Sequence, residues 1–339
     1  MNAGGDNRFL LCGLPGTALD DDERRLLAEL RPGGIILFAR NVESRAQLVE
    51  LVRDLRGLPS RPYVSVDMEG GRVNRLVRLL GPLPSAAAAA AAGTEAADAL
   101  GQAIGAACAH FGIGVDFAPV VDVGRAEGWL GGESRCLACD VAGVVAAAGA
   151  FLAGLERYGV AGCLKHYPGL GSGTVDSHRD LPLLDDEVVA EERAFALLAR
   201  PHRAVMVAHA VAPRLGECVL PASLSAMVIG RLHGWAAGPV ISDDLEMGAL
   251  AAFGSLPERA AAALLAGCDQ ATVSNTMAAR LAVVEEVARW SASDPSVAAR
   301  LRASERRCAG WGRGELPDVA WPDVERLAER VRVMTGVQS

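Results

Sequence analysis

The stretch from Lys165 to His178 (Lys-His-Tyr-Pro-Gly-Leu-Gly-Ser-Gly-Thr-Val-Asp-Ser-His) holds several side chains that could do chemistry. Lys165 is the only lysine of the chain, since all the others of its 33 basic residues are arginines. An ammonium is a compact point charge and a guanidinium is a wide planar fork, so a lone lysine indicates a confined position. Asp176 can accept a hydrogen bond from one nitrogen of His178 and leave the other nitrogen to transfer a proton. The stretch therefore predicts a site that combines a binding cation with acid–base chemistry.

Two adjacent carboxylates, Asp243 and Asp244, follow the apolar run Pro239–Ser242. Successive residues of a strand point to opposite faces, so we expect only one of the two to face a pocket. A carboxylate in a cleft can be a nucleophile toward a glycosidic carbon or a metal ligand. A magnesium site usually adds a second carboxylate and substrate phosphates, and the sequence has no Gly-x-x-x-x-Gly-Lys-Ser/Thr loop to hold phosphate. The carboxylate pair therefore favours a nucleophile.

A third candidate segment runs from Asp67 to Arg75 (Asp-Met-Glu-Gly-Gly-Arg-Val-Asn-Arg). The two oxygens of an aspartate can bind neighbouring sugar hydroxyls, and arginine can donate hydrogen bonds to hydroxyl or carbonyl oxygens. We expect Glu69 and Arg72, in the same segment, to form an ion pair with each other or with a structural partner beneath the site. His209, after another apolar run, is either a ligand-binding or a buried core histidine, and the same alternatives hold for the histidine that follows Lys165.

Eight short apolar runs, each followed by a helical pattern, have to position these side chains. The runs are Phe9–Gly13, Gly34–Asn41, Tyr63–Glu69, Val115–Asp122, Gly162–His166, Ala204–His209, Pro239–Asp244 and Gln270–Ser274. Near-continuous apolar runs are typical of parallel strands buried on both faces. Eight strand–helix units predict an α/β fold, a (β/α)8 TIM-type barrel. No Gly-x-Gly-x-x-Gly follows the first run, which removes the main signal for a dinucleotide-binding sheet.

The candidate residues fall at the carboxyl ends of the predicted strands, which is the face where barrel active sites are built. These residues are Arg40, Asn41, Asp67, Lys165, His166, His209, Asp243 and Asp244. We expect residues 1–339 to form a single catalytic barrel domain with its core at about 8–290, because no segment reads as a linker. Residues 291–339 are expected to form a C-terminal helical extension, with a helix from Val319 to Met334, that packs on the outside of the barrel.

Charge and composition narrow the class of protein further. The net charge of −8 and the absence of basic runs argue against nucleic acid or a membrane surface as partner. No basic segment precedes an apolar one at the start, and no apolar run reaches the ~18 residues of a membrane span, so we expect a cytoplasmic protein. The cysteines are scattered, which is typical of reduced thiols. Cys136 and Cys139 form a C-x-x-C without a second pair, so we expect neither a metal nor a cofactor.

The loop from Lys165 to His178 resembles the signature of the β-N-acetylglucosaminidases of glycoside hydrolase family 3, in which Lys-His-Phe-Pro-Gly-His-Gly precedes Asp-Ser-His. Further segments that agree are Gly34–Asn41, Val66–Val73, Pro221–Ser225, Ser242–Met247 and Ala266–Asp269. The resemblance covers about residues 8–290. The chain departs from the family pattern in three places: Gly124 replaces an asparagine, Leu170 replaces a frequent histidine, and Cys-Leu instead of Ser-Phe follows Arg135.

The resemblance implies a retaining double displacement. Asp243 would be the nucleophile that forms a covalent glycosyl-enzyme, and His178, oriented by Asp176, would be the acid and base. The residues that would bind the sugar are Asp67, Arg75, Arg135, Lys165 and His166, and we add His209 to this group as a candidate. In bacteria such enzymes release N-acetylglucosamine from cell-wall fragments in the cytoplasm, so the expected partner is a small glycan.

Four alternatives remain open. Phosphorolysis is possible because a neutral histidine, unlike a carboxylate, does not repel an attacking phosphate. The chain could also be a β-glucosidase on the same fold or a sugar-binding barrel without activity. The fourth alternative is a metal-dependent hydrolase built on Asp67, His166 and His178. Glycines at 169, 171 and 173 are expected to let the loop that carries His178 move over the pocket mouth.

Overall fold

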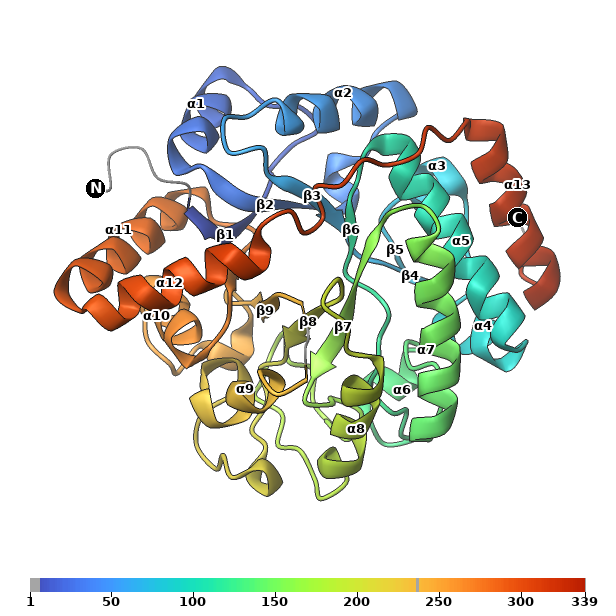
Figure 1. The fold of residues 1–339 in the computed structure, drawn as a ribbon. Coiled ribbons are helices and arrows are strands. Elements are labelled where there is room, and N and C mark those ends of the chain that lie inside the picture. The colour runs from blue at the N-terminus through green and yellow to red at the C-terminus, as the bar shows by residue number, and fades with distance from the viewer. Residues whose placement is uncertain (1–6, 236–237, 339) are drawn as a thin grey trace.

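The computed structural model describes residues 7–235 and 238–338, in which eight parallel strands close into a barrel (Figure 1). The strands are β1 (Asn7–Gly13), β2 (Pro32–Leu37), β3 (Tyr63–Val66), β6 (Val115–Asp116), β7 (Ala161–Tyr167), β8 (Ala204–Val207), β9 (Val240–Asp244) and β10 (Gln270–Val273). Each pairs with the next along the chain, and β10 pairs with β1 to close the sheet. All eight overlap the predicted runs, so the TIM-type barrel is confirmed.

Helices alternate with the strands and cover the outside of the barrel (Figure 1). They are α1 (Asp21–Leu30), α2 (Arg45–Arg56), α5 (Thr94–Phe111), α7 (Val141–Glu156), α8 (Val188–Leu198), α9 (Ala226–Leu232), α10 (Leu256–Ala266) and α11 (Met277–Ser293). The start of α1 shows why the sequence forms a helix there. Asp20 accepts a hydrogen bond from the backbone of Glu23, whose side chain accepts one from the backbone of Asp20. This reciprocal cap satisfies amides that a helix leaves unpaired at its start.

A hairpin and short helices precede the long helix α5 in the connection between β3 and β6. The hairpin consists of β4 (Met68–Gly70) and β5 (Val73–Asn74), and the short helices are α3 (Val77–Leu80) and α4 (Ala86–Ala91). Gly93, with a φ of 108°, separates α4 from α5. A positive φ is costly for other residues, so the alanine-rich sequence turns at this glycine.

The interior of the barrel is filled by apolar side chains, as in other barrels of this kind. Trp311 closes one end: its ring packs edge-on against Tyr63, with the centroids 5.0 Å apart, and its Nε1 donates to the carbonyl of His202 at 3.0 Å. Tyr63 begins β3 and His202 precedes β8, so Trp311 lies at the amino ends of the strands. A site in this barrel therefore has to open at the opposite end.

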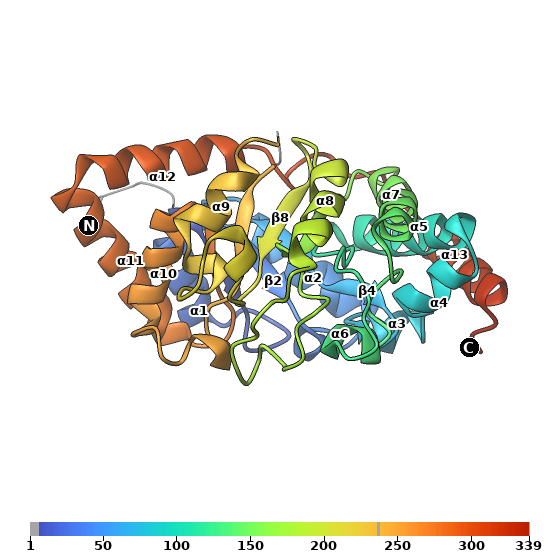
Figure 2. The same ribbon diagram turned by 90° about the horizontal axis from the view of Figure 1, so that it is seen from below.

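The C-terminal residues form two helices, α12 (Pro295–Cys308) and α13 (Trp321–Thr335), on opposite sides of the barrel (Figures 1 and 2). Helix α13 agrees with the predicted helix and packs on α5. Helix α12 was not predicted, because its sequence is rich in arginine and serine and has few apolar residues. Asp294 caps it by accepting a hydrogen bond from the backbone of Ser296 at 2.8 Å. In Figure 2, α12 lies at the upper edge of the barrel and α6 (Trp129–Gly132) at the lower edge.

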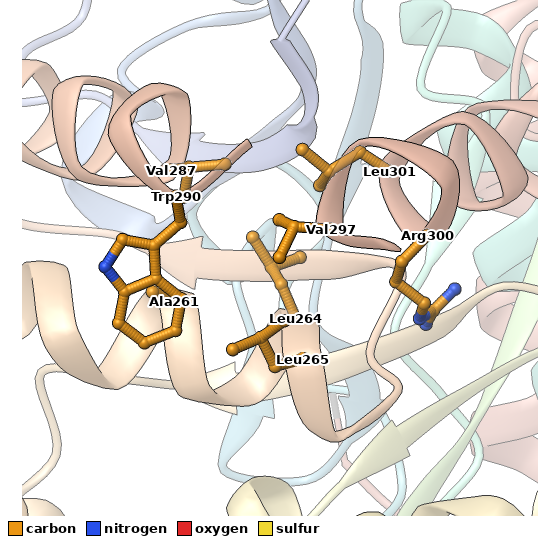
Figure 3. Close-up of a pocket in the computed structure, with 8 residues that line it drawn as sticks. All are labelled: Ala261, Leu264, Leu265, Val287, Trp290, Val297, Arg300 and Leu301. Atoms are coloured by element: carbon orange, nitrogen blue, oxygen red, sulfur yellow. The ribbon is translucent and has the colours of Figure 1, made fainter. Parts of the chain in front are cut away.

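The apolar side of α12 packs on α10 and α11 (Figure 3). Leu264, Trp290, Val297 and Leu301 gather between the three helices. The cavity between them is about 10 Å³, at the limit of what one water molecule needs. These residues therefore stabilise the helix packing and do not form a ligand site. Within the part of the chain that the structure describes, no helix combines the length and the apolar character that crossing a bilayer requires.

Candidate active site

A cavity of about 320 Å³ opens at the carboxyl ends of the strands, opposite Trp311. Eight of the nine side chains predicted for the site line it: Asp67, Arg75, Arg135, Lys165, His166, Asp176, His178 and Asp243. They come from β7, β9, the β4–β5 hairpin region and two loops, and the barrel brings them together from segments far apart in the sequence. The cavity therefore lies where the polar residues at the strand ends predict it. The contacts among these residues determine what each of them can do.

Lys165 lies on β7 at the base of the cavity, with 3% of its side chain exposed. Its Nζ is 2.7 Å from Oδ1 of Asp67 and 2.6 Å from Oε1 of Glu69. Burial by itself would lower the pKa of Lys165, but these two carboxylates outweigh it and raise the pKa above its ordinary value. The ammonium is therefore charged at neutral pH, and its single nitrogen contacts both carboxylates at once, as suits a compact point charge.

Glu69 joins Lys165 to a second cation, Arg135. Nε and Nη2 of Arg135 donate to the two oxygens of Glu69 at 2.8 and 2.9 Å. Burial by itself would raise the pKa of Glu69, but the two cations outweigh burial and the net shift is downward, so the carboxylate is ionised. Of the two expected alternatives for Glu69 and Arg72, Glu69 forms the structural ion pair, and the two residues do not pair with each other: Arg72, exposed at the hairpin turn, pairs with Glu133 at the rim of the cavity. Glu69 instead points inward from β4.

Arg75 lies at the edge of the cavity with unused hydrogen-bond donors. Its Nη2 is 3.9 Å from Oδ2 of Asp67, which is beyond hydrogen-bond distance. Its Nε is buried and has no hydrogen-bond partner among the residues that the structure describes. A buried donor without a partner is costly, so a hydroxyl or carbonyl oxygen of a ligand is the kind of group that fits here.

His166 is held by a carboxylate that the sequence analysis missed. Its Nδ1 is 2.8 Å from Oδ2 of Asp122, and its backbone amide donates to the same carboxylate at 3.1 and 3.2 Å. Asp122 is fully buried and also accepts a hydrogen bond from the backbone of Leu170 at 2.6 Å. These bonds fix the ring and leave Nε2 of His166 for a ligand. Asp122 ends a predicted strand, so the strand-end rule could have found it.

Asp243 and Asp244 both line the cavity, although we expected only one to do so. The cause is a bulge: Gln270 and Thr272, two residues apart on β10, pair with Ile241 and Asp244, three residues apart on β9. An extra residue in one strand breaks the alternation of side chains between faces. Both carboxylates can therefore face the same side.

The two carboxylates differ in their hydrogen bonds. Asp244 accepts hydrogen bonds from the hydroxyl of Ser274 and the backbone of Glu246, and burial raises its pKa to about 6. Oδ1 of Asp243 accepts a hydrogen bond from the backbone of Asp244 at 2.8 Å, and Oδ2 accepts none within residues 7–235 and 238–338. Burial raises the pKa of Asp243, but the nearby His166 and His209 outweigh it, so the net shift is downward. Asp243 is therefore an ionised carboxylate with one oxygen left free by the described residues.

His209 does not line the cavity, so its expected contact with substrate is wrong. Its Nδ1 is 2.7 Å from the hydroxyl of Ser223 and its Nε2 is 2.9 Å from the carbonyl of Asp244. The side chain is fully buried, and burial lowers its pKa. Both ring nitrogens are thus used by the protein. His209 lies beneath the cavity and supports the end of β9.

His178 stands at the cavity mouth and has 68% of its side chain exposed. Its Nδ1 and its backbone amide lie 2.9 and 3.0 Å from Oδ1 of Asp176, which leaves Nε2 free. Burial by itself would raise the pKa of Asp176, but these hydrogen bonds and the nearby His178 together outweigh it, so the net shift of the pKa is downward. The carbonyls of Ser177 and His178 accept hydrogen bonds from the backbone of Ala249 and Gly248. The loop of residues 169–178, called the histidine loop below, is therefore hydrogen-bonded to the segment that follows β9.

Comparison with known proteins now decides the family. The sequence pattern of the "Glycosyl hydrolase family 3 N terminal domain" matches residues 10–307. The chain belongs to glycosyl hydrolase family 3. It is 36% identical over 302 residues to a beta-hexosaminidase of Methylococcus capsulatus, which covers 86% of this chain and 89% of the relative. Family 3 membership makes the chain a glycoside hydrolase and confirms the resemblance seen in the sequence.

Solved structures of family 3 agree with this assignment. A family 3 β-N-acetylglucosaminidase from Paenibacillus sp. superimposes with a TM-score of 0.83 at 28% identity, over 97% of this chain and 67% of that one. NagZ from Neisseria gonorrhoeae, in complex with N-trifluoroacetyl-D-glucosamine, gives a TM-score of 0.80 at 26% identity, over 98% of both chains.

At Leu170 this family 3 chain has an apolar side chain where the family pattern often has a histidine. Leu170 contributes its side chain to the cavity wall, and Asp122 holds its backbone amide. Cys136 and Leu137, after Arg135, are both buried. The cavity wall of this family 3 chain is therefore partly apolar at Leu170, beside the loop that carries His178.

The metal-dependent alternative finds no support in this geometry. Asp67 binds the ammonium of Lys165, and Nδ1 of His166 is bound to Asp122. Within residues 7–235 and 238–338, no three histidine, cysteine or acidic side chains come together in a way that could hold a metal ion. Cys136 is buried, Cys139 is exposed, and both are free thiols.

Two of the three glycines expected to act as hinges, Gly169 and Gly171, lie against neighbouring groups. Gly169 has a φ of +131°, and a Cβ there would lie 2.5 Å from Oε2 of Glu191. A Cβ on Gly171 would lie 1.9 Å from the carbonyl of Val123. These two glycines are required by close packing at the start of the loop. Movement of the loop over the cavity stays a prediction for the residues after them.

Proposed function

We propose that the chain is a retaining exo-β-N-acetylglucosaminidase that hydrolyses terminal β-linked N-acetylglucosamine. The observation that carries the proposal is the pairing, in one cavity, of a free ionised carboxylate, Asp243, with the Asp176–His178 dyad. The names of the relatives, beta-hexosaminidase and β-N-acetylglucosaminidase, support the choice of sugar.

In the first step, His178 donates the proton on Nε2 to the glycosidic oxygen while Asp243 attacks the anomeric carbon. The bond to the leaving group breaks, and an ester between the sugar and Asp243 forms. In the second step, His178 takes a proton from water, the water oxygen attacks the same carbon, and Asp243 is released as a carboxylate. Asp176 stabilises the imidazolium form of His178, which donates the proton in the first step and forms again in the second, and between the two steps the imidazole is neutral.

Asp67, Arg75, Lys165 and His166 are proposed to bind the sugar, since their polar groups surround the base of the cavity. A volume of about 320 Å³ is at the small end of ligand pockets. The cavity therefore fits one terminal sugar, which supports exo action. Arg135 is proposed to act mainly by holding Glu69, since Nε and Nη2 of Arg135 are used there.

We further propose that the whole chain is one catalytic domain, and that its natural substrates are N-acetylglucosamine-containing cell-wall fragments in the cytoplasm. The substrate and the location rest on the resemblance to bacterial family 3 enzymes. The direct test is to assay an aryl β-N-acetylglucosaminide beside the corresponding β-glucoside. Faster turnover of the glucoside would show that the enzyme is a β-glucosidase and would contradict the proposed activity.

Phosphorolysis is a second candidate because the proposed acid–base group is a histidine. Turnover of the same substrate should be measured with and without inorganic phosphate, and the sugar product identified. We expect free N-acetylglucosamine and a rate that does not depend on phosphate. A phosphate-dependent rate with sugar 1-phosphate as product would show that the enzyme is a phosphorylase.

Replacing His178 with alanine should slow the reaction most for substrates that need a proton on the leaving oxygen. For an alkyl glycoside we expect kcat/KM to fall roughly 10²–10⁴-fold, the usual contribution of a general acid. For a 2,4-dinitrophenyl glycoside the fall should be small, since this group leaves as a stable anion. His202→Ala is the matched control, because His202 is exposed and binds Glu156 outside the cavity. Equal losses on both substrates would remove His178 from this role.

The leaving group is expected to lie against Trp129 and Val175. Both are large apolar residues on the cavity wall, and their exposed fractions are 42% and 37%. The backbone amide of Trp129 donates a hydrogen bond to the carbonyl of Gly173 in the histidine loop. Trp129→Ala should therefore lower kcat/KM about tenfold for a disaccharide, whose second ring packs on the indole. The methyl glycoside lacks that ring and serves as control substrate. Equal effects on both would place the leaving group elsewhere.

A further inference from the structure

A buried acidic side chain that the proposed reaction does not use, Glu191, lies under the start of the histidine loop. Glu191 belongs to α8, and its side chain is fully buried. Its Oε2 accepts a hydrogen bond from the backbone amide of Gly171 at 3.2 Å. Gly169 packs so closely on the same carboxylate that only a glycine fits there.

Glu191 works beside a second buried carboxylate, Asp122. The amide of Leu170 donates to Asp122 at 2.6 Å, and the next amide, of Gly171, donates to Glu191. Two consecutive amides are thus held by carboxylates from two different parts of the chain. Asp122 also holds His166, so the base of the cavity and the start of the loop share one set of hydrogen bonds.

The far end of the loop is held as well: the backbone amide of Ala249 donates to the carbonyl of Ser177, and that of Gly248 donates to the carbonyl of His178. Between the two anchors, Thr174 and Val175 are exposed. The position of the imidazole over the cavity therefore depends on both anchors. A displacement of about 1 Å in a catalytic group can cost about 100-fold in rate.

The surroundings of Glu191 make its burial costly. Burial raises its pKa to about 7, and the neighbouring Asp122 adds to this shift. The amide of Gly171 and Arg125, whose Nη2 is 3.5 Å from Oε1, act in the opposite direction. Arg125 also approaches Glu187 at the start of α8, at 3.7 Å. An apolar side chain would fill the space without this cost, so what the carboxyl group adds is its interactions with Arg125 and with backbone amides, of which the bond to Gly171 holds the loop.

We propose that Glu191 is a positioning residue that anchors the start of the loop and thereby sets the place of His178 over the leaving oxygen. The inference rests on the proposed glycosidase function and adds to it a residue outside the cavity. This role requires that the side chain of residue 191 be long enough to bring an acceptor oxygen within hydrogen-bond distance of the backbone amide of Gly171.

Two variants distinguish the effect of the length of the Glu191 side chain from the effect of its charge. E191Q keeps the length and an acceptor oxygen but removes the charge, whereas E191D keeps the charge and withdraws the carboxylate by one methylene. For each purified variant, kcat/KM is measured on methyl β-N-acetylglucosaminide, which needs the proton from His178, and on the 2,4-dinitrophenyl glycoside, which does not. We expect E191D to lose about 10- to 100-fold on the methyl glycoside and less than about threefold on the dinitrophenyl glycoside. E191Q should stay within about threefold of wild type on both.

The outcomes are distinct. Equal losses of E191D on the two substrates would mean a purely structural role and overturn the inference, and so would a larger selective loss in E191Q than in E191D. Circular dichroism and thermal unfolding of both variants show whether either fails to fold. If E191D does, the test is E191Q alone, and a loss of more than about threefold on the methyl glycoside only would overturn the inference. If wild type hydrolyses neither substrate, the proposed function fails, and the inference fails with it.

Discussion

Asp243→Ala should reduce kcat for an aryl β-N-acetylglucosaminide by roughly 10³-fold or more, a loss of the size seen when a catalytic nucleophile is removed. Asp243 is the carboxylate with a free oxygen in the cavity, and His166 and His209 help to keep it ionised. Without it, no covalent intermediate can form. Turnover by the purified variant is compared with wild type, after circular dichroism has shown that the fold is retained.

The neighbouring carboxylate provides the matched control. In Asp244→Asn the amide oxygen can still accept the hydrogen bond of the Glu246 backbone, and the amide NH2 can donate to the hydroxyl of Ser274, so we expect this variant to keep at least about a tenth of the wild-type rate. Added azide should partly restore turnover in Asp243→Ala by attacking from the vacated side, giving the α-glycosyl azide. More than a few per cent of wild-type turnover without azide would contradict the assignment.

Lys165→Met should cost both stability and activity, because it removes the ammonium between Asp67 and Glu69. Breaking a buried ion pair on one side typically lowers the free energy of unfolding by about 3–5 kcal/mol, since the remaining charge stays buried. Arg135 still pairs with Glu69, which places the expected loss at the lower end of that range. Activity should fall about 100-fold or more, because Asp67 loses the group that positions it.

The loss of stability should depend on pH. In wild type the pKa of Glu69 is lowered, so its contribution to stability is present above the ordinary pKa of a glutamate and is lost as the pH falls. In Lys165→Met the pKa of Glu69 rises, and protonation relieves its burial. The difference in the free energy of unfolding between wild type and variant should therefore shrink from pH 7 to about pH 5. Urea unfolding at both pH values measures it, and a difference that grows on acidification would contradict the account.

Lys165→Arg is the control for charge. It keeps a cation but replaces the compact ammonium by a wide planar fork. We expect it to be more stable than Lys165→Met and still inactive. Full activity in Lys165→Arg would show that the compact shape of the lysine ammonium is not required at this position.

The barrel and the location of the site could be predicted because both depend on patterns that lie within short segments. Near-continuous apolar runs indicate parallel strands, and polar residues at their ends face one side of the barrel. Lys165, His166 and Asp243 were found in this way. The helix α12 was not, because its stability comes from the Asp294 cap and a narrow apolar side on α10 and α11.

The partners within the site could not be predicted, because they join segments far apart in the sequence. Glu69 pairs with Arg135 instead of Arg72 because the hairpin turns one side chain inward and the other outward. His209 has the residue type and the strand-end position of a ligand-binding group, but Ser223 and the backbone of β9 use both of its nitrogens. The bulge that brings Asp244 into the cavity depends on pairing with β10.

The central claim is that Asp243 forms a covalent bond with the sugar, and trapping that intermediate tests it most directly. The protein is incubated with a 5-fluoro derivative of N-acetylglucosaminyl fluoride, whose second fluorine slows hydrolysis of the glycosyl-enzyme while the acetamido group is kept. The labelled protein is digested and the peptides are sequenced by mass spectrometry. We predict one added sugar, on the peptide that contains Asp243, with fragment ions placing it on that residue. A label on any other residue, Asp244 included, or release of fluoride with no labelled protein at any time, would contradict the account.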